Sequence, residues 1–316
     1  MTRPVLIDTD PGLDDALAIM LAFASPELDV RGVTTVGGNT GLQHTTENAL
    51  RLLHLLDRDD VPVAAGADTP LVRRDSRPAT EVHGEEGIGG VRLDPAPRGV
   101  DARSAVQLMT DVIEESAEPV TLIALGPLTN VAALLAAAPR TAARLERIVL
   151  MGGGARILGN TTPTAEFNIW FDPDAASRVF AGGVPVTMVG LDVTHSAVTA
   201  PADWDPLRGG GRMARAALAM MDFYTARQLE WSGSDRTPQH DSLAVATAIR
   251  PELVTTRRLH VDVECAGALT RGMTVVDLDG LSGEKAETDV ALEVDAAAFT
   301  ELLIGRLAEL DGRLGA

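Results

Sequence analysis

Short apolar runs alternate with longer helical patterns along the first two thirds of this chain, and this alternation restricts the possible fold more than any other feature. Six runs rich in β-branched residues predict strands at residues 5–8, 31–36, 61–65, 120–125, 147–151 and 184–192. Helical patterns lie between them at 13–24, 42–57, 102–117, 128–137 and 173–181. Strands that are apolar throughout are buried on both faces, and strands that alternate with helices pair in parallel. The sequence therefore predicts an α/β fold with an open, mostly parallel sheet and helices on both faces.

The last third of the chain has a different pattern. Helical segments are expected at about 212–231, from Asp241 onward and at 297–310. Two strand-like segments, 259–267 and 272–280, predict a pair that extends the sheet. No linker rich in Pro, Gly or Ser and no internal repeat divides the 316 residues, so we expect a single domain over 1–316. The only long irregular stretch covers 66–99, and a loop of that length is usually functional or disordered.

The charge and composition exclude several classes of partner. The formal net charge is −18, and Lys285 is the only lysine among 27 basic residues. So acidic a surface repels nucleic acid and anionic membranes. The longest clean apolar run, 16–24, is too short to span a bilayer, and the N-terminus lacks a cleavable signal pattern. A single cysteine, Cys265, excludes an internal disulfide and suits a reducing compartment, so we expect a cytoplasmic protein.

Four aspartates crowd the segment VLIDTDPGLDDALAIM at residues 5–20: Asp8, Asp10, Asp14 and Asp15. Acidic residues in the first turn of a helix are favourable by themselves. Four carboxylates beside one strand end repel each other, however, unless a cation or a network of donors gathers them. The segment therefore predicts a binding site for a ligand.

Three more unusual segments follow other predicted strands. They are GGNT at 37–40, LGPLTN at 125–130 and MGGG at 151–154. In open α/β sheets, ligands bind beyond the carboxyl ends of the strands. We therefore expect these segments and the acidic segment to form one site.

A hard cation held by oxygen atoms suits these residues best. Asp10, Asp15 and Asp241 can supply carboxylates, and the turn at Leu125 can supply a backbone carbonyl, which are the ligand types that Ca²⁺ takes. An EF-hand is excluded because its glycine is misplaced and Ile19 occupies the twelfth loop position. No cluster of cysteine and histidine has zinc spacing.

A magnesium-dependent phosphatase is an alternative, because an Asp-x-Asp pair follows the first strand. That chemistry also needs a downstream lysine, and the only one, Lys285, lies far along the chain in a turn-like region. Arginine does not easily replace a lysine that acts as a point charge. The alternative is therefore disfavoured.

Seven segments, in order over essentially the whole chain, are similar to the signature segments of the inosine–uridine-preferring nucleoside hydrolases. They read DTDPGLDDALA, GGNT, LGPLTN, MGG, N–TTPTAEFN–W–DP–A, HD and TRGMTVVD. The resemblance implies a single Rossmann-like α/β domain that binds Ca²⁺ and cleaves the N-glycosidic bond of ribonucleosides. It also implies a homodimer or a homotetramer.

The resemblance also implies roles for individual residues. Calcium ligands are expected at Asp10, Asp15, the Leu125 carbonyl and Asp241, and Asp10 would also take a proton from a calcium-bound water. Ribose contacts are expected from Asp14, Asn39, Asn160, Glu166 and Asn168, with the Met151 backbone nearby. The family usually has His-Asp-Pro where this chain has His240-Asp241-Ser242, a change that affects rigidity more than ligation.

The chemistry explains why such residues are needed. Hydrolysis of a riboside passes through an oxocarbenium-like state that water attacks, and a metal lowers the pKa of that water. The segment AEFNIW is expected to be extended, so that Glu166 and Asn168 point the same way and grip one sugar ring. Asp14 would accept from a ribose hydroxyl.

The departing base is expected to meet a second group of side chains. His240 would protonate or hydrogen-bond it, His83 would close over it, and Phe167 would lie against the sugar or the base. Gln228 and Trp231, on the helix before His240, could line the base pocket, although packing is the expected role for both. Structural or surface roles are expected for the remaining histidines near helices and strand ends, which are His44, His54 and His195.

The sequence thus favours a calcium-dependent ribonucleoside hydrolase. A nucleoside- or ribose-binding protein without catalysis is the main alternative, although binding alone would not require a carboxylate in the position of Asp10. The preference for purines or pyrimidines stays open at this level.

Overall fold

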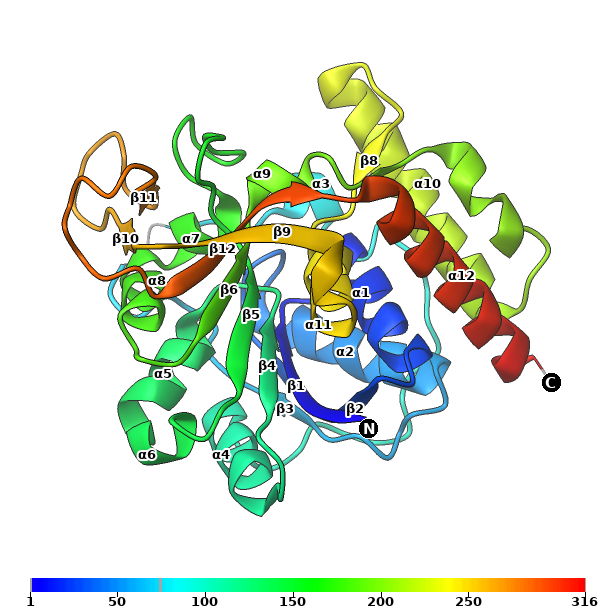
Figure 1. Ribbon diagram of the computed structural model, residues 1–316. Coiled ribbons are helices and arrows are strands. Elements are labelled where there is room, and N and C mark those ends of the chain that lie inside the picture. Colours follow the sequence, from blue (N-terminus) through cyan, green and yellow to red (C-terminus); the bar gives the residue numbers. More distant parts are fainter. Residues whose placement is uncertain (1, 74–75, 316) are drawn as a thin grey trace.

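An eight-stranded sheet runs through the middle of the molecule. The structure is a computed structural model that describes residues 2–73 and 76–315. The strands follow the order β3-β2-β1-β4-β5-β6-β12-β9 (Figure 1). Their bounds in that order are Val63–Ala65, Leu28–Thr35, Arg3–Thr9, Thr121–Ala124, Arg147–Met151, Val186–Val189, Thr288–Val294 and Val254–Leu259. All neighbours are parallel except β12 and β9, so the predicted mostly parallel sheet is confirmed.

The strand order reverses at β1. From β1 the chain order runs outward through β2 and β3 on one side and through β4, β5 and β6 on the other. In such sheets a crevice forms beyond the carboxyl ends of the strands beside the reversal. Asp8 at the end of β1 pairs in register with Ala124 at the end of β4, so Asp10 and Leu125 follow at the same edge. The topology therefore brings the acidic segment and the LGPLTN turn together.

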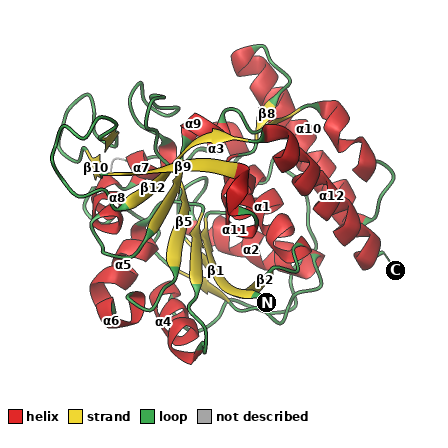
Figure 2. Ribbon diagram, in the orientation of Figure 1, coloured by secondary structure: helices red, strands yellow, loops and turns green. Residues whose placement is uncertain are grey.

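Helices cover both faces of this sheet (Figure 2). Each face packs against its helices to form a separate hydrophobic core, so alternate side chains of β1 enter different cores. Val5 and Ile7 belong to one core, and Leu6 belongs to the other. The helices of the first core are α1 (Leu13–Ala24), α2 (Leu42–Leu55), α10 (Arg212–Ser232), α11 (His240–Ile249) and α12 (Ala296–Leu314). Those of the second core are α4 (Ala105–Glu115), α5 (Thr129–Ala137) and α8 (Pro173–Phe180).

Shorter elements connect the layers. They are α3 (Thr80–His83), α6 (Pro139–Ala142), α7 (Phe167–Phe171), α9 (Leu191–Thr194), the antiparallel pair β7 (Val198–Thr199) and β8 (Thr237–Pro238), and 3-10 helices at Pro201–Leu207 and Pro251–Leu253. Among residues 2–73 and 76–315, no helix has both the length and the apolar character needed to cross a membrane.

The predicted extension of the sheet by residues 259–267 and 272–280 is wrong. These segments form a separate antiparallel pair, β10 (Val261–Val263) with β11 (Thr274–Val276). The sheet is extended instead by β12 and β9. Four consecutive residues of β9 are exposed, which is why this edge strand lacks the apolar run that identifies the central strands.

The predicted strand at 184–192 is too long. β6 ends at Val189, and α9 begins at Leu191 after Gly190. A Cβ atom on Gly190 would lie 2.7 Å from the Gly153 carbonyl oxygen, so the chain turns where only glycine fits. The apolar run continues past this turn because α9 is also buried.

Candidate active site

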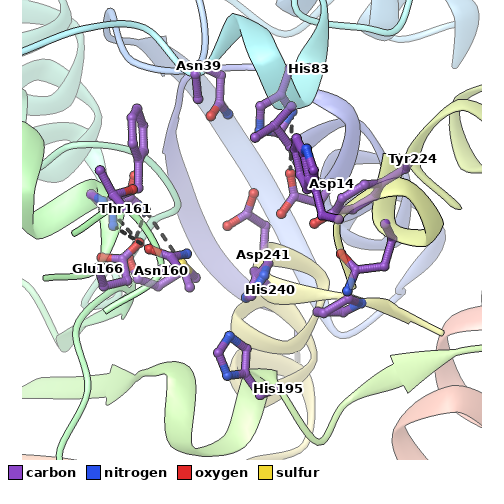
Figure 3. Close-up of a pocket in the computed structure, with 18 of the residues that line it drawn as sticks. Asp14, Asn39, His83, Asn160, Thr161, Glu166, His195, Tyr224, His240 and Asp241 are labelled. Carbon is purple, nitrogen blue, oxygen red and sulfur yellow. Dashed lines mark hydrogen bonds and ion pairs between the residues drawn. The ribbon is translucent and has the colours of Figure 1, made fainter. Parts of the chain in front are cut away.

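A cavity of about 600 Å³ lies at the carboxyl edge of the sheet (Figure 3). Its walls come from segments far apart in the sequence, including α3, α7, α10 and the start of α11. All the site residues predicted from the sequence line this cavity, except Asp10 and Asp15. The predicted residues that line it are Asp14, Asn39, His83, Leu125, Met151, Asn160, Glu166, Phe167, Asn168, His240 and Asp241.

Three carboxylates gather at this cavity. Asp14, Asp15 and Asp241 each place an oxygen so that all three atoms lie within 4.8 Å of one another. The first two begin α1 and the third begins α11, two helices that pack together. Both helix N-termini therefore bring partial positive charge to the same place, which favours anionic side chains there.

Burial makes it energetically costly for all three carboxylates to be charged. It raises the pKa of Asp14 to about 8, and the charge of Asp15 adds to that rise. Burial also raises the pKa of Asp15 and of Asp241. Three carboxylates so close together need either protons or a cation between them.

Fixed donors hold Asp15 in one orientation. Its Oδ1 accepts from the Thr9 hydroxyl at 2.5 Å, and its Oδ2 accepts from the Gly12 N–H at 3.0 Å and from the Asn39 amide at 2.8 Å. A carboxylate that accepts three hydrogen bonds is held in place before any ligand arrives.

Asp10 occupies a separate buried position next to this cluster. Its Oδ2 accepts from the Asn39 N–H at 2.7 Å. A Cβ atom on Gly38 would lie 2.1 Å from Oδ2, and one on Gly126 would lie 2.3 Å from Oδ1. Two glycine turns therefore enclose the carboxyl group. Burial and then the charge of Asp15 raise the pKa of Asp10 well above its ordinary value.

The predicted extended conformation of AEFNIW is wrong. Glu166 is the N-cap of α7, and its side chain accepts from the N–H groups of Asn168 at 3.0 Å and of Ile169 at 3.2 Å. This capping chemistry starts a helix where the residue types alone indicate a strand. Glu166 and Asn168 both line the cavity nevertheless.

Asn168 ties two strand ends together. Its Nδ2 donates to the Leu125 carbonyl at 2.6 Å and to the Met151 carbonyl at 3.1 Å. On the same side of the cavity, the Asn160 side chain accepts from the Phe167 N–H at 3.0 Å. Figure 3 shows Asn160 and Glu166 on one side of Asp241, with Asp14 and His83 on the other.

His83 is held as a neutral ring. Its Nδ1 accepts from the Leu13 N–H at 3.1 Å, which places the ring proton on Nε2. Burial lowers the pKa of His83 to about 3. Its 4.0 Å contact with Asp14 is therefore not an ion pair near neutral pH.

His240 is also neutral. Its Nδ1 lies 2.8 Å from the Thr194 hydroxyl oxygen, and burial lowers its pKa to about 3. The ring of His195 lies edge-on to it, with the ring centroids 5.8 Å apart. His195, for which a structural or surface role was expected, also lines the cavity.

One face of α10 forms a further wall. Tyr224, Gln228 and Trp231 are spaced four and three residues apart and line the cavity together. Packing was expected for the last two, and Tyr224 was missed, although the same helical spacing could have identified it. Burial, and then the charges of Asp14 and Asp241, raise the pKa of Tyr224, which keeps its hydroxyl protonated.

The donor set fits a hard divalent metal ion. The cluster consists of carboxylates alone, and the Leu125 backbone lies at the same cavity. In the described part of the chain, no arginine or lysine forms an ion pair with Asp14, Asp15 or Asp241. The acidic cluster could therefore bind a metal.

Comparisons with known proteins identify the family. A family profile described as inosine-uridine preferring nucleoside hydrolase matches residues 5–301. This chain therefore belongs to the inosine-uridine preferring nucleoside hydrolase family. The resemblance seen in the sequence is confirmed, and with it the prediction of a ribonucleoside hydrolase.

Curated relatives cover nearly the full length of this chain. The pyrimidine-specific ribonucleoside hydrolase RihA of Klebsiella pneumoniae (strain 342) is 48% identical over 311 residues, which cover 98% of this chain and 99% of the relative. The protein of the same name from Escherichia coli O7:K1 is 46% identical over 310 residues, which cover 97% of this chain and 99% of the relative.

Solved structures share the fold. A purine-preferring ribonucleoside hydrolase from Gardnerella vaginalis superposes with a TM-score of 0.92 at 33% identity, covering 98% of this chain and 99% of the other. A plant nucleoside hydrolase has the same TM-score, identity and coverage. The expected α/β architecture is thus that of solved members of the family.

Proposed function

We propose that this chain hydrolyses the N-glycosidic bond of pyrimidine ribonucleosides in a calcium-dependent reaction. The observation that carries the proposal is the buried cluster of Asp14, Asp15 and Asp241 beside a cavity with acceptors for sugar hydroxyls. The proposal includes one domain over 1–316, a cytoplasmic location and a homodimeric or homotetrameric assembly.

Calcium would be held by Asp10, Asp15, Asp241 and the Leu125 carbonyl. Oxygen ligands of this kind and a rigid, negatively charged site suit Ca²⁺. Asp10 belongs to the set because Asn39 joins it to Asp15: the Asn39 N–H donates to Asp10 Oδ2 at 2.7 Å, and the Asn39 amide donates to Asp15 Oδ2 at 2.8 Å. Bound there, the ion would orient a water molecule and lower its pKa.

The ribose ring would lie between the two walls of the cavity. Asp14 and Glu166 offer carboxylate oxygens, and Asn39, Asn160 and Asn168 offer amides, with the Met151 carbonyl beside Asn168. Acceptors buried to this degree are left unpaired by a sugar that lacks a hydroxyl. Ribosides are therefore preferred over 2′-deoxyribosides.

Asp10 would accept a proton from the attacking water. Its Oδ2 accepts from the Asn39 N–H at 2.7 Å, which holds the carboxyl group in one orientation. A positioned carboxylate that contacts the metal-bound water can take the proton as the water attacks.

The departing base would meet neutral imidazoles. Because burial lowers the pKa of His83 and of His240 to about 3, they act here as hydrogen-bond donors rather than as imidazolium ions. His83 carries its ring proton on Nε2, since Nδ1 accepts from Leu13. Phe167 would lie against the sugar or the base.

The preference for pyrimidines rests on the relatives. The most similar curated proteins reported above are named pyrimidine-specific and are 46–48% identical over nearly the whole chain. In this chain, Gln228 and Arg236 place polar groups at the cavity wall, which suit the oxygen and nitrogen atoms of a uracil or cytosine edge.

A panel of ribonucleosides tests this function. Release of free ribose would be measured for uridine, cytidine, inosine and adenosine. We expect kcat/KM for uridine and cytidine to exceed that for the purine ribosides by at least tenfold. Faster cleavage of inosine would contradict the pyrimidine preference, and binding of uridine without release of ribose would favour the non-catalytic alternative.

A further inference from the structure

A second cavity, away from the active site, has four arginine side chains in its lining. It has a volume of about 270 Å³, and five of its ten lining residues are Arg51, His54, Arg92, Arg212 and Arg215. Among the described residues, it shares no lining residue with the active-site cavity. Four guanidinium groups around one hollow are unusual in a chain of net charge −18.

Three separate segments bring these side chains together. Arg51 and His54 lie on α2, Arg92 lies on the loop after α3, and Arg212 and Arg215 lie in the first turn of α10. Like charges that converge from different segments repel each other unless an anion lies between them. A concave surface also focuses the positive potential.

Two of the arginines are only partly satisfied. Arg51 pairs with Glu47, and Arg212 pairs with Asp57. A guanidinium carries five N–H donors, so one carboxylate leaves several of them available. The Nε of Arg51 is buried and has no hydrogen-bond partner among the described residues.

The other two arginines lack a carboxylate partner in the described ranges. Arg215 donates to the Gly210 carbonyl at 3.1 Å, and no ion pair involves Arg92. Asp94 is the single acidic residue in the lining, and His54 is engaged by Asp59 at 2.9 Å. The lining therefore carries an excess of positive charge and unused donors.

We propose that this cavity binds a phosphate group, either free or as the monoester of a small polyol or sugar. Arginine forks match the oxygen spacing of phosphate, and several arginines together favour a dianion over a monoanion. The volume is just below the roughly 300 to 1,000 Å³ of sites for drug-sized ligands, which suits a ligand of this size.

Calorimetric titration of the calcium-loaded enzyme with glycerol 3-phosphate tests the site. Ionic strength is held constant with sodium chloride, because surface attraction is screened by salt. Inorganic phosphate at low concentration is the second probe and distinguishes the free ion from the ester. Glycerol and acetate are the neutral and monoanionic controls. We expect saturable binding of one phosphate per chain and none of glycerol.

The double variant Arg92→Ala/Arg215→Ala should weaken the binding of glycerol 3-phosphate at least tenfold. Arg31→Ala is the matched control, because Arg31 is exposed and pairs with Asp29 outside the cavity. If the double variant does not fold, the single variant Arg92→Gln, at an exposed side chain, should still weaken binding at least threefold.

Several results would overturn the proposal. They are the absence of saturable binding, equal affinity in the double variant and in Arg31→Ala, or displacement of the phosphate by saturating ribose, which would place it in the active-site cavity. Acetate binding as tightly as glycerol 3-phosphate would reassign the cavity to carboxylates. None of these results depends on whether the chain cleaves nucleosides.

Discussion

Asp10 and Asp14 come from one short segment, yet their surroundings differ. Asp14 lines the active-site cavity within a group of three carboxylates. Asp10 is enclosed by Gly38, Gly126 and Asn39 and does not line that cavity. Each position suits its proposed task, since a hydroxyl acceptor must reach the sugar and a general base must be held rigidly.

Replacing Asp10 by asparagine tests the second task. Asn keeps an oxygen ligand but does not accept the proton, so we expect kcat for uridine to fall by about 10²- to 10⁴-fold. Calcium content, measured by elemental analysis, should stay near that of the wild type. The matched variant Asp29→Asn, at an exposed carboxylate, should keep full activity. Near-normal kcat with calcium retained would exclude Asp10 as the base.

His240→Ala separates activation of the sugar from activation of the base. We expect kcat for uridine to fall by roughly 10²-fold, because the uracil leaving group needs a hydrogen-bond donor. p-Nitrophenyl riboside should lose little, since its leaving group is a stable anion. His44→Ala is the control at an exposed histidine outside the active-site cavity. Equal losses on both substrates would mean that His240 supports the neighbouring Asp241 instead.

At the scale of elements, α10 links the two cavities. Its first turn brings Arg212 and Arg215 to the cationic cavity, and its later turns bring Tyr224, Gln228 and Trp231 to the active site. A helix is stiff over such a length, because each residue is tied to the next turn by a backbone hydrogen bond. One helix thus contributes residues to two cavities, and local sequence patterns do not predict that it does so.

The start of α8 is the element that we expect to be most sensitive to one substitution. Asp172 caps α8 through the Ala175 N–H at 3.1 Å, and it also accepts from the Leu71 N–H at 2.9 Å and the Thr129 hydroxyl at 2.7 Å. Asp172→Ala removes all three bonds, so we expect the free energy of unfolding to fall by about 2–4 kcal/mol.

Urea denaturation measures that change. Asp174→Ala, two positions along the same helix, is the matched control and should lose less than about 0.5 kcal/mol, the usual range for surface substitutions. A loss below 1 kcal/mol for Asp172→Ala would mean that other acceptors, such as water, replace its carboxylate in these contacts.

At the scale of the whole molecule, the acidic cluster joins two helices of one core. Asp15 lies on α1 and Asp241 on α11, and both side chains are buried. An ion that binds only the folded state stabilises it by about 2.7 kcal/mol at a hundredfold excess over its Kd. The proposed calcium ion would therefore stabilise the fold in addition to the two cores.

Removal of calcium should thus lower the melting temperature. After prolonged chelation we expect a decrease of roughly 5 °C and loss of ribose release, with both restored by added calcium. Differential scanning calorimetry gives the first quantity. In Asp241→Asn the shift on chelation should be smaller, because one ligand is weakened. Full activity in a preparation shown to be free of metal would contradict calcium dependence.

The sequence by itself determined the strands β1 to β6 of the central sheet and eleven of the residues that line the active-site cavity. Continuous apolar strands and the polar segments after them are local signals, and parallel pairing then brings their ends together whatever the details of packing. The membership of Asp14, Asn39 and Leu125 in the cavity follows from this topology.

Only the tertiary structure decided the remaining features. The exposed edge strand β9 depends on its pairing with β12, and Glu166, which caps the helix at AEFNIW, also accepts from the distant Gly153 N–H. His195, Tyr224 and the arginine-lined cavity are made of residues that become neighbours only when distant segments pack. Their positions are set by non-local burial and capping, whereas sequence patterns report local periodicity and turn chemistry.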